Sequence, residues 1–349
     1  MDSDIFTDEL SSPFIFITGN SRSGTTMMMR VLANYSEVHA INEPHFFEKL
    51  WSPGDAQKKI GRDQAFDLLA KLFTGQRAGF FEPVTRHVHK YRDEIDQLLD
   101  SCADGCTRMQ LYARFMLHEA HRAGKTIPCE KTPQNVFYIE EILSAFPNAK
   151  VVNMIRDPRA VMLSQKRKWK RKYLGADFIT KKEMIRLRIN YHPVTIAKLW
   201  MAAIAAVQPF DTHERVYNLR FEDLIDAPET TIRELCSFLG LSYSDEMLQV
   251  PHAGSSSEAD KGTERGIKRR RPESFLEKGL TPEEIKICRN ICGDFMDRYN
   301  YKPMDVKTRP VLMAWQYALF PVKLGLALVW NLHRMRDVSD TIKRRLKSK

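Results

Sequence analysis

A glycine turn between a strand and a helix constrains the fold of this chain more than any other feature. The run Phe14-Ile-Phe-Ile-Thr18 is apolar, β-branched and aromatic, so it predicts a buried strand. The turn Gly19-Asn-Ser-Arg-Ser-Gly24 follows, and Thr25–Leu32 has the composition of a helix. Backbone N–H groups of such a turn converge on an anion at the helix N-terminus. The unit therefore predicts a phosphate-binding loop.

This loop differs from the Walker A loop of ATP- and GTP-binding enzymes. A Walker A loop has lysine where this chain has Thr25, and that lysine reaches the β- and γ-phosphates. The cation of the present loop is Arg22 instead. The substitution disfavours a kinase-like enzyme that uses ATP and Mg²⁺, which stays as an alternative.

Strands and helices alternate along the remaining chain. Further strands are expected at 38–41, from 127, at 151–155 and at 215–219, and helices at 64–73, 91–99, 109–122, 134–146, from 159, and at 230–239. This alternation predicts an α/β domain with a mainly parallel central sheet flanked by helices. The sequence Thr281-Pro-Glu-Glu284 marks a further helix start, with Thr at the N-cap and Pro at N1.

A second anion-binding element is expected after the strand at 151–155. Arg156 follows this strand directly, at the edge where open α/β sheets bind their ligands. Ser164 lies eight residues further, on the next helix. Together the two side chains suit a phosphate. A surface ion pair between Arg156 and Asp157 is the structural alternative.

Four motifs, taken in order, resemble the sulfotransferase family. They are Ser21-Arg-Ser-Gly-Thr-Thr26, Glu130-Lys-Thr-Pro133, Ile155–Ser164 and Leu219–Leu241, and the resemblance spans residues 14 to 303. These enzymes transfer a sulfuryl group from 3′-phosphoadenosine 5′-phosphosulfate (PAPS) to a hydroxyl or amine. The resemblance implies a P-loop-like sulfotransferase fold, PAPS as co-substrate and no metal.

The resemblance also assigns the cofactor-binding residues. The 3′-phosphate is expected on Arg156 and Ser164, with Arg270 and Arg271 of the basic segment 268–271 near the nucleotide. A solvated loop is the alternative for that basic segment. The 5′-phosphosulfate is expected on Arg22, Ser23, Gly24, Thr25 and Thr26.

The base is expected to be Glu43. Tyrosylprotein sulfotransferases use a glutamate 21 residues after the loop arginine, and Glu43 has that spacing from Arg22. Cytosolic phenol and steroid sulfotransferases use a histidine after Lys-Thr, where this chain has Pro133. His45 is the alternative base, and capping of the following helix is the structural alternative for Glu43. Lys131, with Arg22, is expected to stabilise charge on the oxygen that leaves sulfur.

Composition limits the partners and the compartment. Lys and Arg number 54 against 44 Asp and Glu, giving a net charge of +10. This excess suits a polyanionic co-substrate, and a nucleic-acid-binding protein is the alternative from a different class. The six cysteines are sparse, so we expect reduced thiols without metal. The acidic N-terminus does not resemble a signal peptide, which predicts a cytoplasmic protein.

The chain is expected to comprise a domain over residues 1–308 and a helical appendage over 309–349. Residues 311–330 are nearly all apolar apart from Gln316 and Lys323, and basic residues follow at 343–349. Because Lys323 makes spanning costly, the segment predicts peripheral membrane contact through 311–349. A helix packed on the domain or on a second subunit is the alternative.

The acceptor is expected to be a small apolar alcohol, a sterol, a phenol or a lipid ahead of a glycan or a peptide tyrosine. Acceptor loops are expected at 46–81 and 166–192. Either an apolar pocket or the core would explain Met27–Met29, Phe46, Phe47, Trp51, Phe80 and Phe81.

Overall fold

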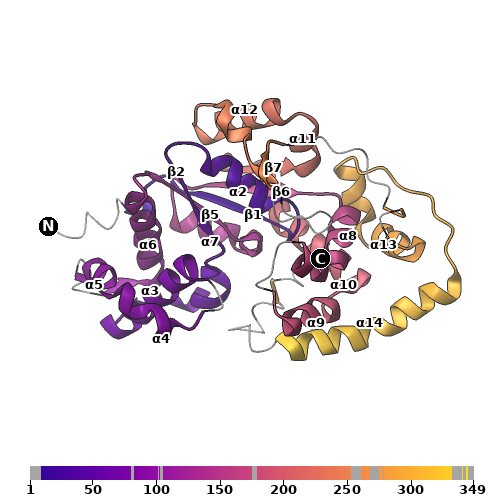
Figure 1. The fold of residues 1–349 in the computed structure, drawn as a ribbon, viewed down its shortest axis with the longest axis horizontal. Coiled ribbons are helices and arrows are strands. Elements are labelled where there is room, and N and C mark those ends of the chain that lie inside the picture. The colour runs from indigo at the N-terminus through magenta and orange to yellow at the C-terminus, as the bar shows by residue number, and fades with distance from the viewer. Residues whose placement is uncertain are drawn as a thin grey trace. The chain divides into compact units, whose positions relative to one another are not determined.

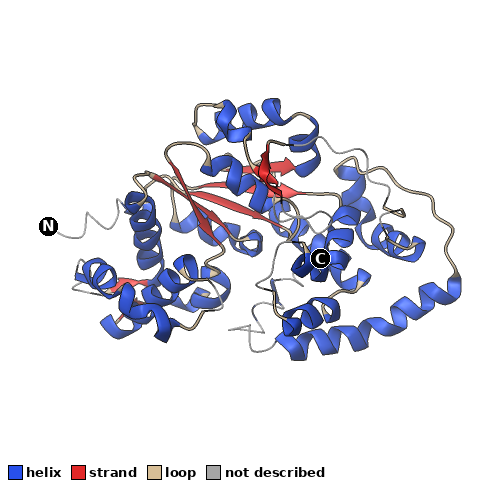
Figure 2. Cartoon of the chain, in the orientation of Figure 1, coloured by secondary structure: helices blue, strands red, loops and turns tan. Residues whose placement is uncertain are grey.

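A five-stranded sheet is the main sheet of the computed structural model. The structure describes residues 9–79, 82–100, 102, 105–174, 179–252, 261–267, 275–277, 279–331, 340 and 343–344. The strands of the main sheet, red in Figure 2, follow the order β2-β5-β1-β6-β7. Strand β5 pairs in parallel with both β1 and β2, and Asn42 lies opposite Lys131. The expected α/β fold with a parallel sheet is confirmed. The strands are β1 (Ile15–Gly19), β2 (Val38–Asn42), β5 (Ile127–Lys131), β6 (Lys150–Ile155) and β7 (Val216–Arg220).

Helices alternate with these strands along the chain (Figure 1). Two short ladders, β3 (Lys59–Ile60) with β4 (Cys106–Thr107) and β8 (Pro251–His252) with β9 (Lys261–Arg265), are antiparallel. The helices are α2 (Thr25–Ala33), α3 (Arg62–Arg77), α4 (Val84–His87), α5 (Arg92–Asp100), α6 (Arg108–Arg122), α7 (Ile139–Ala145), α8 (Pro158–Arg167), α9 (Lys181–Ile189), α10 (Pro193–Val207), α11 (Phe221–Asp226), α12 (Pro228–Leu239), α13 (Pro282–Arg298) and α14 (Pro310–Asn331).

The chain divides into two compact units. The first comprises residues 1–18, 25–153 and 212–217, and the second comprises residues 19–24, 154–211 and 218–349. The phosphate loop thus belongs to the second unit, and helix α2 after it belongs to the first. The expected division at residue 308 stays a prediction.

Aromatic packing forms much of the core of the first unit. The Phe46 ring stacks on Tyr112 with centroids 4.0 Å apart, and Phe47 packs against both Trp51 and Tyr138. All these rings are buried. Of the two expectations for Phe46, Phe47 and Trp51, the core is therefore the one realised. Met28 is also buried, Met27 and Met29 are half-buried, and Phe80 and Phe81 lie outside the described residues.

The core of the second unit lies where α8, α10 and α13 pack together. Trp200 is fully buried there, and its indole N–H donates to the Arg156 carbonyl at 2.9 Å. Helix α13 starts as expected, because Thr281 and Glu284 form a reciprocal capping box. The hydrogen bond from Trp200 to the Arg156 carbonyl therefore holds the backbone after β6 against the core.

The helix expected at 134–146 begins differently. Residues Pro133–Tyr138 form a 3₁₀ helix, and α7 starts only at Ile139. The Asn135 N–H donates to the Thr132 carbonyl at 3.0 Å. This i to i+3 hydrogen bond is the pattern of a 3₁₀ helix, which is tighter than an α-helix.

The expectation of six reduced cysteines is wrong for two of them. Cys102 and Cys106 form a disulfide with their Cα atoms 5.8 Å apart. The turn at Gly105, whose φ is 77°, brings the two residues within the usual bridging distance. The free thiols are buried and are those of Cys129, Cys236, Cys288 and Cys292.

Candidate active site

The phosphate loop has a backbone that only glycine permits at two positions. Gly19 and Gly24 have φ values of 136° and 95°. A Cβ on Gly19 would lie 2.4 Å from the Met154 carbonyl oxygen, and one on Gly24 would lie 2.3 Å from Phe221 Cδ2. Since neither the backbone oxygen nor the buried ring can move freely, side chains are excluded from both positions. No side chain at these two positions therefore covers the backbone of the loop.

The loop offers an unsatisfied donor. The Ser23 side chain is fully buried, and its Oγ has no hydrogen-bond partner among the described residues. Such a group costs free energy unless a ligand or water satisfies it. The orphaned hydroxyl, beside the Arg22 guanidinium in sequence, therefore fits an anionic group such as phosphate or phosphosulfate.

Within the second unit, the two expected anion-binding elements meet. Arg22 Nε donates to Ser164 Oγ at 2.9 Å, and Arg156 donates to the Arg22 carbonyl at 3.2 Å. Asp157 ion-pairs with Arg159 at 2.7 Å, so its carboxylate is engaged away from the expected surface pair. Arg22, Arg156 and Ser164 thus form one cationic, hydroxyl-bearing cluster.

Phe221 is a residue of this cluster that the sequence did not single out. The Arg156 guanidinium lies 4.3 Å from the centroid of the Phe221 ring. The same ring lies against Gly24 of the phosphate loop. Phe221 therefore fixes both the loop and one of its cations. In the sequence, Phe221 lies in the motif Leu219–Leu241 and is an aromatic residue directly after β7.

In the first unit, Glu43 and Lys131 pair across neighbouring strands. The Glu43 N–H donates to the Lys131 carbonyl at 2.9 Å, and the Lys131 ammonium donates to the Glu43 carboxylate. The Lys131 side chain is only 2% exposed, whereas that of Glu43 is 40% exposed. Thr25 and Thr26, in the first turn of α2, belong to the same unit.

Glu43 does not cap the helix that follows. That helix, a π-helix at Phe46–Leu50, has His45 at its N-cap and no side-chain capping bond. Both Glu43 and His45 have positive φ values, of 52° and 51°, which cost free energy for residues other than glycine. His45 lies 3.7 Å from Glu43 and 3.4 Å from Glu48, so the alternative base adjoins the expected one.

Glu130, the first residue of the motif Glu130–Pro133, has a role that the motif did not indicate. It is buried beside Lys131 on β5, and it accepts hydrogen bonds from Thr132 Oγ1 and from Asn135 Nδ2, the latter at 2.6 Å. Burial raises the pKa of Glu130 to about 8. The residue therefore ties the turn after β5 together and thereby supports the strand end that carries Lys131.

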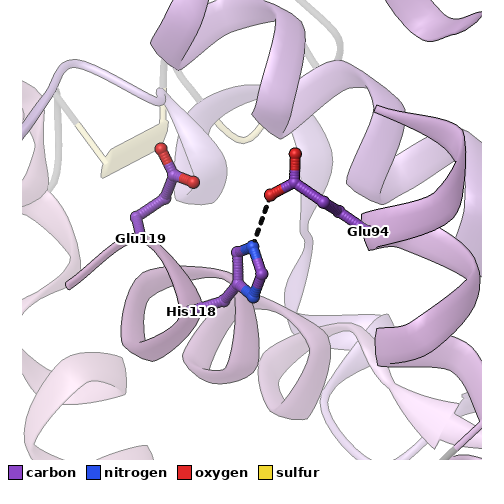
Figure 3. Close-up of side chains that lie close together, drawn as sticks. All are labelled: Glu94, His118 and Glu119. Atoms are coloured by element: carbon purple, nitrogen blue, oxygen red, sulfur yellow. Dashed lines mark hydrogen bonds and ion pairs between the residues drawn. The ribbon is translucent and has the colours of Figure 1, made fainter. Parts of the chain in front are cut away.

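A histidine and two glutamates also gather outside these elements (Figure 3). His118 Nε2 lies 2.7 Å from Glu94, and Arg77 pairs with both Glu94 and Glu119. Arg77 holds the pKa of Glu94 at about 2, well below its ordinary value. Because the guanidinium already supplies the positive charge, the group is an ion-pair network of the first unit.

Arg270 and Arg271 lie outside the described residues.

Comparison with known proteins identifies the family. The model of the sulfotransferase family matches residues 13–245. The chain belongs to the sulfotransferase family. The resemblance seen in the sequence motifs is thereby confirmed.

The sulfotransferase relatives are distant and differ in acceptor. Protein-tyrosine sulfotransferase 2 of Gallus gallus is 26% identical over 73% of this chain and 60% of its own length. Omega-hydroxy-beta-dihydromenaquinone-9 sulfotransferase Stf3 of Mycobacterium tuberculosis is 24% identical over 87% of this chain and 80% of its own. A solved sulfotransferase domain from the curacin biosynthetic pathway is 17% identical, with a TM-score of 0.47, over 81% of this chain and 97% of that one. The chain thus spans 60% of the length of the Gallus relative.

Proposed function

We propose that this sulfotransferase transfers the sulfuryl group of PAPS to an acceptor hydroxyl. The observation that carries the proposal is the cluster of Arg22, Arg156 and Ser164, linked by contacts of 2.9 and 3.2 Å. Two cations joined to a phosphate-loop backbone suit a ligand with more than one anionic group. PAPS, the donor of the family, has a 5′-phosphosulfate and a 3′-phosphate.

The loop residues would hold the 5′-phosphosulfate. Ser23 contributes the orphaned buried hydroxyl, and Thr25 and Thr26 contribute hydroxyls and N–H groups at the start of α2. Arg156 and Ser164 would hold the 3′-phosphate, as the family resemblance implies. No metal is needed for this binding, because arginine side chains and backbone dipoles supply the positive potential.

Glu43 would act as the general base. The acceptor oxygen attacks sulfur, its proton passes to the Glu43 carboxylate, and the bond from sulfur to the bridging phosphate oxygen breaks. The leaving product is adenosine 3′,5′-bisphosphate (PAP). Lys131 donates to Glu43 in this structure, and we infer that its ammonium stabilises the charge that develops on the leaving oxygen.

We infer an apolar acceptor, a sterol, a phenol or a lipid alcohol, ahead of a glycan or a peptide tyrosine. The support is a relative named for a menaquinone substrate, which aligns over 87% of this chain. Relatives named for tyrosine and carbohydrate acceptors align over 84% and 97%, so coverage does not separate the acceptor classes and the acceptor panel below decides between them. We also propose a cytoplasmic location at the membrane periphery. The Cys102–Cys106 disulfide is of a kind that oxidising compartments favour. Cell fractionation therefore tests the proposed cytoplasmic location.

Turnover of labelled PAPS tests the function and the acceptor together. A panel of sterols, phenols, lipid alcohols, glycans and tyrosine peptides should give label transfer to an apolar hydroxyl. Thermal unfolding tests the donor, because PAP at a hundredfold excess over Kd should stabilise the fold by about 2.7 kcal/mol. Equal stabilisation by ATP with Mg²⁺ would favour the kinase-like alternative instead.

A further inference from the structure

Helix α14 exposes an apolar face along its whole length. Val311, Trp315, Val322 and Val329 are 79%, 60%, 59% and 70% exposed. No exposed position of this helix, which is described throughout, carries a charged side chain. An exposed surface of this size and composition needs a partner. By length and composition alone, α14 could cross a membrane, and none of it is buried.

The polar residues of α14 lie on its inner side. Lys323 donates to the Arg188 carbonyl at 3.4 Å, and Asn331 lies 2.9 Å from both Arg186 and Asn190. Gln316 is half-buried, and its carbonyl is 3.1 Å from His192 Nε2. Apolar residues such as Phe320, whose ring lies 5.6 Å from that of His192, share this inner side. The outer side is exposed and has no charged side chain, unlike the outer side of a helix that covers a protein core in water. Lys323, the residue that makes spanning costly, is therefore turned toward the protein.

Basic residues gather on the elements beside α14. Helix α9, next to α14 in Figure 1, begins with Lys181 and Lys182. The 3₁₀ helix at Lys168–Tyr173, called η5 below, contains four more basic residues and packs on α9, with Arg188 4.6 Å from the Trp169 ring. Glu183 is the one acidic residue of these two described elements, and it pairs with Arg186.

We propose that α14, with η5 and α9 beside it, docks the chain on an anionic membrane surface. The helix would lie in the plane of the interface with its outer face among the acyl chains, because its inner side is held by α9. Trp315 and Tyr317 suit the headgroup boundary, and the lysines of η5 and α9 attract anionic lipid. A second copy is a poorer occupant, since two identical basic surfaces would approach each other. The inference does not depend on the proposed donor.

Vesicle co-sedimentation tests the docking surface. The full chain should bind phosphatidylcholine vesicles that contain phosphatidylglycerol, and should bind pure phosphatidylcholine less. Replacing two outer residues in a V322D/V329D variant should lower the partition coefficient by about tenfold or more, because apolar burial is lost. The K181E/K182E variant should lower it by about fivefold per lysine at low salt, and added salt should reduce this difference.

The control is Leu276→Asp, which places one such carboxylate on an exposed apolar residue outside these elements. This variant should bind vesicles like the wild type. PAP should stabilise V322D/V329D as it does the wild type, so a failure of docking is separable from a failure of the proposed function. Three outcomes overturn the inference: no vesicle binding, equal loss in the Leu276 variant, or dimerisation in ultracentrifugation that V322D/V329D abolishes.

Discussion

Lys131 and Glu43 place a buried ammonium and a half-exposed carboxylate in direct contact. The pair forms because β2 and β5 are parallel neighbours with Asn42 opposite Lys131, so the residue after β2 reaches the lysine. The carboxylate is the more accessible partner, which suits a group that must take a proton from an acceptor. The Glu43 side chain is also more exposed than that of His45, 40% against 14%, so accessibility favours Glu43 as the base.

Glu43→Gln should lower kcat by about 10²- to 10⁴-fold, since the amide cannot take the proton. PAP affinity should stay near the wild-type value, because the residue is not assigned to the nucleotide. Steady-state kinetics and calorimetry of PAP binding measure the two effects. His45→Ala is the matched control and should keep most of kcat. The reverse pattern would make the histidine the base.

Glu130 predicts a pH dependence of stability. Burial raises its pKa from the ordinary 4.5 to about 8. Between these values the native state keeps a proton that the unfolded chain has lost, so this group's stabilisation is complete below pH 4.5 and declines as pH rises toward 8. Glu130→Gln keeps an acceptor for Asn135 and removes that decline. Denaturant midpoints from pH 5 to 8.5 measure it, with the exposed Glu229→Gln as control; an unchanged slope would contradict the prediction.

At the scale of elements, the junction of β1 and α2 depends on contacts made by glycine. Gly24→Ala should weaken PAP binding and destabilise the fold by about 1–3 kcal/mol, because the residue has a positive φ and its Cβ would meet the Phe221 ring. Gly75→Ala is the control: the position is helical with open space around it, so alanine should stabilise by about 0.5–1 kcal/mol. Thermal unfolding and calorimetry measure both variants. Unchanged PAP affinity in Gly24→Ala would contradict the assignment of the loop.

Local patterns predicted the elements well, because strands such as β1 and caps such as Thr281 depend on neighbouring residues only. Helix α10 was missed, since it is nearly all apolar, and its two polar residues, Thr195 and Lys198, are too few to reveal a helical period. The Cys102–Cys106 bridge was missed because six cysteines in 349 residues favoured reduced thiols, although the turn at Gly105 places these two within bridging distance. The roles of Phe221 and Glu130 were missed because they exist only in tertiary contacts with Gly24, Arg156 and Asn135.

At the scale of the whole molecule, a net charge of +10 attracts any polyanion, so affinity for nucleic acid alone would not distinguish a binding protein from an enzyme. The distinction lies in the local cluster.

Arg156→Met should lower PAP affinity by about 10- to 100-fold, the usual worth of hydrogen bonds from a charged group, and should leave retention on duplex DNA unchanged. Raising the salt concentration should release DNA steeply while PAP stays bound, because binding to the DNA backbone depends on counterion release. Calorimetry and filter binding measure the two ligands, and Arg233→Met, which removes an exposed arginine that is paired with Glu229, is the charge-matched control. Equal losses of PAP and DNA binding in Arg156→Met, or PAP binding that falls as steeply with salt as DNA binding, would assign the basic surface to nucleic acid instead.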